Sequence, residues 1–122
     1  MLTSFVRTIE LYRSLSGKCP VEEFLDGLPD RDAQKVAWVL RLVEQLDRIP
    51  EQYFNKLVGT EYLWEIRAQS GGNSYRLLGF FDGAKLLIVA TGFSKKQQKT
   101  PRREIEVAEQ RRSDYFQRRT KP

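Results

Sequence analysis

The chain has 122 residues, of which 40% are apolar, 30% charged and 11% aromatic, a balance typical of one folded domain and unlike that of a disordered segment. The lone Cys19 excludes a disulfide framework and a multi-thiolate zinc site, and the absence of histidine removes the commonest metal ligand and general base, so we expect neither a metal nor any other cofactor. The net charge is +5, and the excess lies in residues 91–122, which contain ten Lys and Arg but only four Asp and Glu. This excess of positive charge is as consistent with binding a nucleic acid or an acidic protein as with a plain solvated surface.

The first half of the chain predicts one strand and two helices. Residues 5–12 alternate between apolar and polar side chains well enough for a strand. Pro20 and the acidic residues after it mark the start of a short helix that closes at residues 27–29. Asp30 is the expected N-cap of a longer helix that runs up to Pro50. The apolar stripe of this longer helix comprises Val36, Val39, Leu40, Val43 and Leu46.

After a loop through residues 55–59, three short runs rich in aromatic and β-branched residues predict a meander of strands. The runs are, in chain order, residues 62–68, 74–81 and 85–93. Turn signals at residues 69–73 and at Asp82-Gly83 separate them. Alternation along the first run puts Trp64 and Ile66 on one face and Glu65 and Arg67 on the other. The third run is apolar enough to be a central strand that is buried on both faces.

The last element is a helix that Thr100 caps and Pro101 opens. The full order β-α-α-β-β-β-α predicts an α+β fold, in which two N-terminal helices and a C-terminal helix pack on a small, mostly antiparallel sheet. We expect one domain over residues 1–122, with a frayed tail from residue 116. Because the longest apolar run covers only residues 86–90 and the first residues lack a signal-peptide core, we expect a cytoplasmic protein with no membrane partner.

Basic residues occupy strand positions and the segment just after the last predicted strand. These residues are Arg67, Arg76, Lys95, Lys96 and Lys99. A meander can bring them together on one face of the sheet, although charged residues also occur in strands of which one face is simply exposed to solvent.

Three segments in the second half of the chain carry a resemblance to a known group of proteins: LWEIR, YRLLGFFDG and GFSKKQQKTPRREIEVAEQRRSDY. Together they resemble the RelE/ParE superfamily of toxins, in its phage-associated, HigB-like branch. The resemblance covers residues 62–116, and its most specific part is the GF-x-KK-x-x-K-T-P block. It implies a RelE-like fold and a toxin made in tandem with an antitoxin, often a helix-turn-helix protein. The implied activity is that of an mRNA interferase, a ribosome-dependent endoribonuclease that needs no metal and has mRNA and the ribosome as its other partners.

The resemblance also implies a catalytic site. Arg67 falls where relatives place a basic catalytic residue, Arg76 on the second-strand arginine, and Lys95 and Lys96 on the basic position after the third strand. Glu65 stands where relatives often have a second basic residue, and the last helix has no clear counterpart to their tyrosine. Guanidinium groups suit charge stabilisation on phosphate, and a lysine crowded by cations suits proton transfer. For Glu65 two roles stay open, a general base or a salt bridge that orients Arg67.

Further residues are expected to bind RNA around this site. They are Lys99, Arg102 and Arg103 as phosphate contacts, and Tyr75 or Phe93 as an exposed ring on which a base stacks. Two other functions stay open. A ParE-like toxin would bind DNA gyrase without cutting RNA, and a phage RNA- or protein-binding module would have no enzymatic activity.

Overall fold

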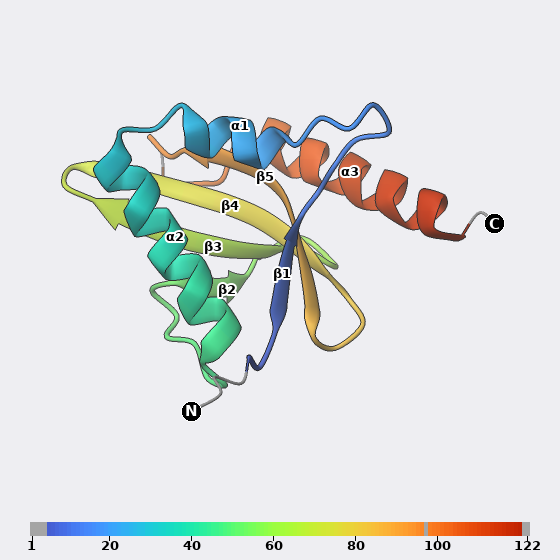
Figure 1. The fold of residues 1–122 in the computed structure, drawn as a ribbon, viewed down its shortest axis with the longest axis horizontal. Helices are drawn as coiled ribbons and strands as arrows, with labels where there is room; N and C mark the ends of the chain where they lie inside the picture. The colour runs from blue at the N-terminus through green and yellow to red at the C-terminus, as the bar shows by residue number, and fades with distance from the viewer. Residues whose placement is uncertain (1–4, 97, 121–122) are drawn as a thin grey trace.

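The computed structural model describes residues 5–96 and 98–120, which form three helices and five strands (Figure 1). In chain order the elements are β1 (Thr8–Leu11), α1 (Pro20–Asp26), α2 (Asp30–Gln45), β2 (Phe54–Lys56), β3 (Trp64–Ser70), β4 (Asn73–Asp82), β5 (Leu86–Ser94) and α3 (Arg102–Thr120). The predicted α+β class is confirmed. The order is β-α-α-β-β-β-β-α, with one strand more than predicted.

The five strands form one sheet in the order β1-β5-β4-β3-β2. Strands β2 to β5 pair antiparallel, and only β1 runs parallel to its neighbour β5. The sheet is therefore mixed and mostly antiparallel. Because β5 is paired on both sides and largely buried, the prediction of a central strand from its apolar sequence is confirmed.

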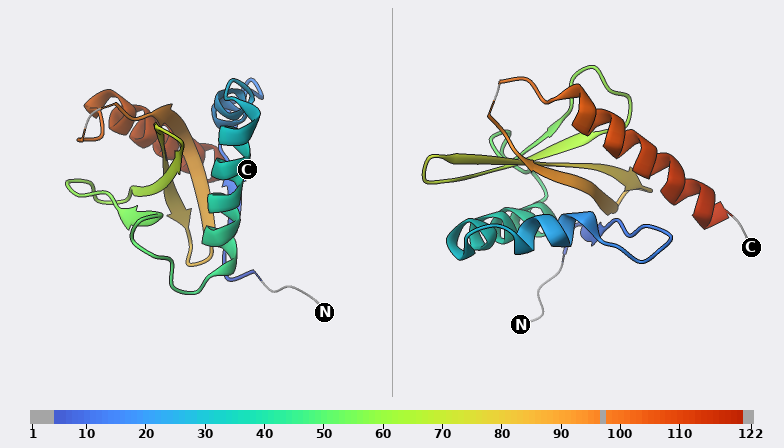
Figure 2. Two further views of the ribbon diagram at one scale, coloured as in Figure 1. Left: turned by 90° about the vertical axis from the view of Figure 1, so that its left-hand side faces the viewer. Right: turned by 90° about the horizontal axis from the view of Figure 1, so that it is seen from above.

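Helices α1 and α2 cover one face of the sheet and α3 covers the other (Figure 2). The face under α1 and α2 has a core that includes Val36, Val39, Ile66, Leu77 and Val89. The α3 face has a core that includes Leu78, Phe80, Ile88, Ala90 and Ala108. Burial of each large apolar side chain contributes roughly 1.5–3 kcal/mol of transfer free energy. Contacts between these buried side chains therefore hold the helices against both faces of the sheet.

The loop predicted through residues 55–59 is wrong in its first part, because Phe54–Lys56 form β2 and pair with β3. A strand of three residues is too short to show an alternating pattern, and its pairing is decided by the neighbouring strand. The N-terminal strand is also shorter than predicted. Before Thr8, the N–H groups of Val6 and Arg7 donate to the Glu44 carbonyl oxygen at 2.8 and 3.1 Å, so this part of the chain pairs with the end of α2.

The helix ends differ from the predictions in their caps. Pro29 occupies the N-cap of α2 and Asp30 is the first helical residue, where its charge complements the helix dipole without a capping hydrogen bond. Helix α2 ends at Gln45, so Leu46 lies just outside it. Helix α3 is helical through Thr120, which includes residues 116–120 of the tail expected to fray, and residues 121 and 122 lie outside the described residues. Within the described part of the chain, no helix has the length and apolar character needed to cross a membrane.

Candidate active site

The pairing of β3 with β4 brings the two strand arginines together. Arg67 and Arg76 are directly opposite each other in the register, so their side chains leave the same face of the sheet. Glu65 lies two residues before Arg67 on that face, which confirms the predicted alternation along β3. Just beyond β5, the Lys95 N–H donates to the Ser74 carbonyl oxygen at 2.8 Å, which brings Lys95 beside the start of β4.

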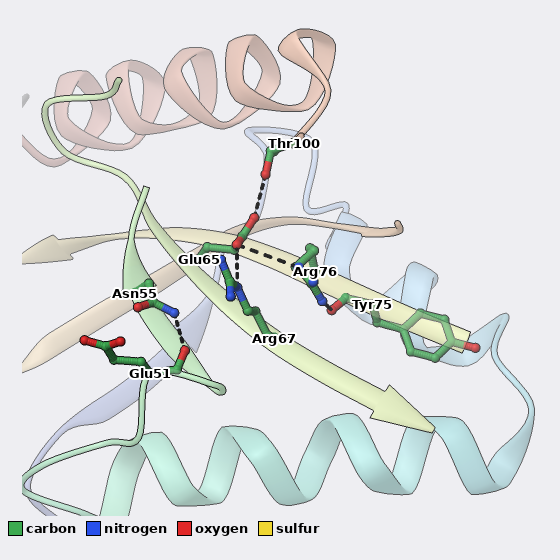
Figure 3. A network of polar contacts seen from close by, with 7 residues as sticks. All are labelled: Glu51, Asn55, Glu65, Arg67, Tyr75, Arg76 and Thr100. Atoms are coloured by element: carbon green, nitrogen blue, oxygen red, sulfur yellow. Dashed lines mark hydrogen bonds and ion pairs between the residues drawn. The ribbon is translucent and has the colours of Figure 1, made fainter. Parts of the chain in front are cut away.

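Glu65 is the centre of the polar network at this face (Figure 3). It is only 1% exposed, and its Oε1 accepts a hydrogen bond from Arg67 Nε at 2.8 Å and lies 3.7 Å from Arg76 Nε. Its Oε2 accepts a hydrogen bond from the Thr100 hydroxyl at 2.6 Å. Burial raises the pKa of Glu65, but the hydrogen bonds from Thr100 and Arg67 and the nearby positive charges outweigh burial and leave this pKa below its ordinary value. Glu65 is therefore held as a carboxylate that links β3 and β4 to the segment before α3.

Arg76 is the more enclosed of the two arginines, with 15% of its side chain exposed. Its Nη1 donates to the Tyr75 carbonyl oxygen at 3.1 Å, while its buried Nε has no hydrogen-bond acceptor among the described residues. Burial, more than the charge of Arg67, lowers the pKa of Arg76, and Glu65 opposes this shift. An arginine remains protonated in such a setting, so the guanidinium is a fixed positive charge.

The four basic residues predicted to be catalytic line one hollow of about 440 Å³, which we call the basic hollow. Its lining residues are Arg67, Ser74, Arg76, Lys95, Lys96 and Gln98. The pKa of Lys95 is lowered, first by burial and then by the charges of Arg76 and Arg67, against the opposing effect of Glu65. The basic hollow thus combines two guanidinium groups with a lysine that releases its proton more readily than an exposed lysine does.

The predicted RNA-binding cations are divided between this region and the start of α3. Lys99 lines an adjoining hollow of about 400 Å³ together with Glu65, Arg67, Lys95 and Thr100, so it belongs to the same surface. Arg102 and Arg103 are exposed on the first turn of α3, and Arg102 Nε pairs with Glu106 Oε1 at 3.2 Å. Neither of these two arginines lines the basic hollow.

The expectation that Tyr75 or Phe93 presents an exposed ring is wrong. Tyr75 is 4% exposed and lies on the α2 face of the sheet, where its hydroxyl donates to Asp32 Oδ2; Figure 3 shows its ring pointing away from Glu65. Phe93 is 8% exposed and is part of the core under α3. Large rings on strand positions gain more from burial against a helix than from exposure, and strand alternation alone did not tell which face each would take.

Sequence reasoning missed the contact that Thr100 makes. The predicted cap is wrong, because the Thr100 hydroxyl donates to Glu65 and α3 begins two residues later, at Arg102. The position of Thr100 inside the K-T-P part of the specific block was the signal that could have suggested a role at the site.

A larger hollow, of about 550 Å³, lies between β1 and α3. Two of its lining side chains are already paired, since Asp114 accepts hydrogen bonds from the Tyr12 hydroxyl at 2.5 Å and from Arg118 Nε at 2.9 Å. The basic hollow, by contrast, is lined by four cations and has no acidic residue among its described lining residues, so size alone is a poor guide to the chemistry. Over residues 5–96 and 98–120, no three cysteine or carboxylate side chains gather into a metal-binding group.

Comparison with known protein families assigns the chain to one of them. A model of the family described as phage derived protein Gp49-like (DUF891) matches residues 23–113, well over half of the chain, including β3, β4, β5 and the basic hollow. The comparison with curated proteins found no match. The chain therefore belongs to the Gp49-like family of phage-derived proteins.

Proposed function

We propose that this protein is the toxin of a type II toxin-antitoxin pair and acts as a ribosome-dependent endoribonuclease of the RelE/ParE superfamily, in its HigB-like branch. Membership of the Gp49-like family and the resemblance of residues 62–116 support the class. The observation that carries the proposed activity is the convergence of Arg67, Arg76, Lys95 and Lys96 on one hollow.

The proposed reaction draws its nucleophile from the RNA itself. The 2′-oxygen of the RNA forms a bond to the adjacent phosphorus while its proton passes to a base, and the bond from phosphorus to the 5′-oxygen breaks as that oxygen gains a proton from an acid. The products are a 2′,3′-cyclic phosphate and a 5′-hydroxyl. Negative charge builds up on the phosphorane, and fixed guanidinium groups stabilise that charge most effectively in a partly buried site.

In this scheme Arg67 and Arg76 bind the non-bridging phosphate oxygens. Lys95 exchanges the proton, since its lowered pKa suits proton transfer near neutral pH better than that of an ordinary lysine. Glu65 is a positioning residue, because both of its oxygens accept hydrogen bonds and its carboxylate is buried beneath Arg67. This choice favours the orienting salt bridge over the general base that the sequence left open.

The proposed partners follow from the charge of the site. A cognate antitoxin, a helix-turn-helix protein in relatives of this kind, would silence the protein by covering the basic hollow with an acidic or amphipathic segment. Binding of that kind weakens as salt concentration rises. The mRNA and the ribosome are the remaining proposed partners.

A purified translation system with programmed ribosomes tests the proposal. The protein is expected to cut the mRNA, with cut sites mapped by primer extension, and Arg76→Ala is expected to slow cleavage by roughly 10²–10³-fold. Lys85→Ala is the control, since it removes one positive charge from the exposed turn at the far end of β4 and β5. Intact mRNA with the wild-type protein would overturn the proposal. A simultaneous loss of DNA supercoiling by gyrase would then favour the ParE-like alternative, and unimpaired growth on expression would favour a non-enzymatic binding module.

A further inference from the structure

Another hollow opens beside the basic hollow, on the side of β3 that faces α2. Its volume is about 450 Å³, and we call it the Lys35 hollow. Lys35 of α2, Gln52 and Tyr53 of the segment before β2, and Gln69 of β3 line it. Arg67 and Arg76 line both hollows, so the two are joined at the arginine pair.

The Lys35 hollow exists because β2 is short. Strand β2 pairs only with residues 64–66 of β3, and the last contact on this edge is the Arg67 N–H donating to the Tyr53 carbonyl oxygen at 2.8 Å. Beyond that contact, residues 68–70 of β3 have no partner strand on their outer edge within the described part of the chain. Alternation along a strand directs the backbone N–H and C=O of Gln69 to the same edge as those of Arg67. The floor of the hollow therefore offers a backbone donor and acceptor.

The charged residues that line the Lys35 hollow are all positive. Lys35, Arg67 and Arg76 contribute three cations, and none of its described lining residues is acidic. The Lys35 ammonium lies 4.2 Å from the centre of the Trp38 ring, a cation–π contact that holds its head group near the surface of α2. Such a hollow attracts an anion, and its position beside the arginine pair suits a phosphate next to the scissile phosphate that the proposed function places in the basic hollow.

An aromatic surface completes the Lys35 hollow. Tyr53 lines it, and the Tyr53 ring packs edge-on against the Trp38 ring with 5.7 Å between their centres. Trp38 is 39% exposed, and Tyr53 is half-buried and packs against the core under α1 and α2, so the pair lies where that core meets the surface. An aromatic ring at the wall of such a hollow can stack on a base of any sequence, which single-stranded nucleic acid offers and an acidic peptide does not.

We propose that the Lys35 hollow binds the nucleotide next to the scissile phosphate. Tyr53 stacks on the base, Lys35 pairs with the phosphate, and the outer edge of β3 at Gln69 contacts the polar edge of the base. This subsite rests on the proposed function, since it places the RNA by its scissile phosphate at Arg67 and Arg76. It extends the contact with RNA from the basic hollow around the edge of the sheet towards α2.

Binding of a labelled 2′-O-methyl RNA hexanucleotide, which lacks the attacking hydroxyl, tests the subsite by fluorescence anisotropy. Tyr53→Ala is expected to weaken binding by roughly 5–150-fold, the range found for loss of one stacked base. Tyr53→Phe is expected to bind like the wild type, and Lys35→Ala is expected to bind more weakly with a shallower dependence on salt. Tyr62→Ala is the matched control, an exposed tyrosine whose ring packs against Arg112 of α3.

A second measurement on the wild-type protein avoids dependence on variants that fold poorly. RNA carrying 4-thiouridine is expected to crosslink, on illumination, to the peptide that contains Gln52 and Tyr53. Absence of that crosslink, together with wild-type affinity in Tyr53→Ala and Lys35→Ala, would overturn the subsite. The proposed function would survive this result if Arg76→Ala still lost cleavage, whereas cleavage unaffected by Arg76→Ala would remove the proposed function itself. Variants that bound RNA normally but lost affinity for the antitoxin would assign the Lys35 hollow to a protein partner and would also overturn the subsite.

Discussion

The hydroxyl of Thr100 donates a hydrogen bond of 2.6 Å to Oε2 of Glu65, 35 positions earlier in the chain. This bond joins the segment between β5 and α3 to the middle of the sheet. It also occupies one oxygen of the carboxylate whose other oxygen orients Arg67. The segment before α3 and the orientation of Arg67 therefore depend on the same buried acid.

The first prediction concerns this hydrogen bond. Thr100→Val removes the donor and leaves Oε2 of the buried Glu65 without it, so the free energy of unfolding is expected to fall by about 1–3 kcal/mol. Thr100→Ser keeps the hydroxyl and is expected to lose much less. Urea denaturation followed by tryptophan fluorescence measures both variants, and equal stability of Thr100→Val and Thr100→Ser would show that the hydroxyl is unimportant.

The second prediction separates proton transfer from charge at Lys95. Lys95→Arg keeps the positive charge but replaces the amine with a group that does not deprotonate, so cleavage is expected to slow by roughly 10²–10⁴-fold. Lys96→Arg makes the same change on the neighbouring, more exposed lysine and is expected to have a small effect. Cleavage rates on ribosome-bound mRNA measure the difference. A Lys95→Arg variant as active as the wild type would leave Lys95 with a purely electrostatic role.

The third prediction concerns the effect of the Glu65 charge on the pKa of Lys95. The Glu65 carboxylate raises the pKa of Lys95, partly offsetting the lowering by burial and by Arg76. Removing that negative charge in Glu65→Gln is therefore expected to lower the Lys95 pKa further. The limb of the pH–rate profile that reports Lys95 should move to lower pH, and the maximal rate should fall because Arg67 loses its ion pair. Single-turnover cleavage measured across pH checks this, and an unmoved limb would contradict the assignment of that limb to Lys95.

The fourth prediction concerns acid stability. Hydrogen bonds from Ser70 and Tyr75 hold the pKa of Asp32 below its ordinary value, so the carboxylate is stabilised in the folded state. A depressed pKa contributes stability that is fully present above the unfolded pKa of about 3.9 and is lost as pH falls through the lower folded value. Asp32→Asn is expected to have a lower Tm than the wild type at neutral pH, with the gap closing in acid. Thermal melts from neutral pH to about pH 2 test this, with Asp26→Asn on the exposed side of α1 as control. A gap that is constant with pH would contradict a role for the Asp32 charge.

Local patterns in the sequence determined most of the elements. The 3.6-residue spacing of Val36, Val39 and Val43 predicted α2. The alternation along residues 64–67 predicted β3 and placed Arg67 on the same side as Glu65, opposite Trp64. These predictions depended on near neighbours along the chain, whose side chains take the same or opposite sides for steric reasons alone. The cations of the candidate site stood out by their positions at strands and strand ends, but only the resemblance of residues 62–116 selected them as catalytic candidates.

Only the tertiary structure decided which residues meet. Strand β2 exists because β3 offers it a partner, and the rings of Tyr75 and Phe93 turned inwards because helices on both faces of the sheet bury them. The contact of Thr100 with Glu65 and the approach of Lys35 to the arginine pair join segments more than 30 positions apart. No local propensity encodes such contacts, because their free energy comes from burial and charge pairing that appear only when the whole sheet has closed on its helices.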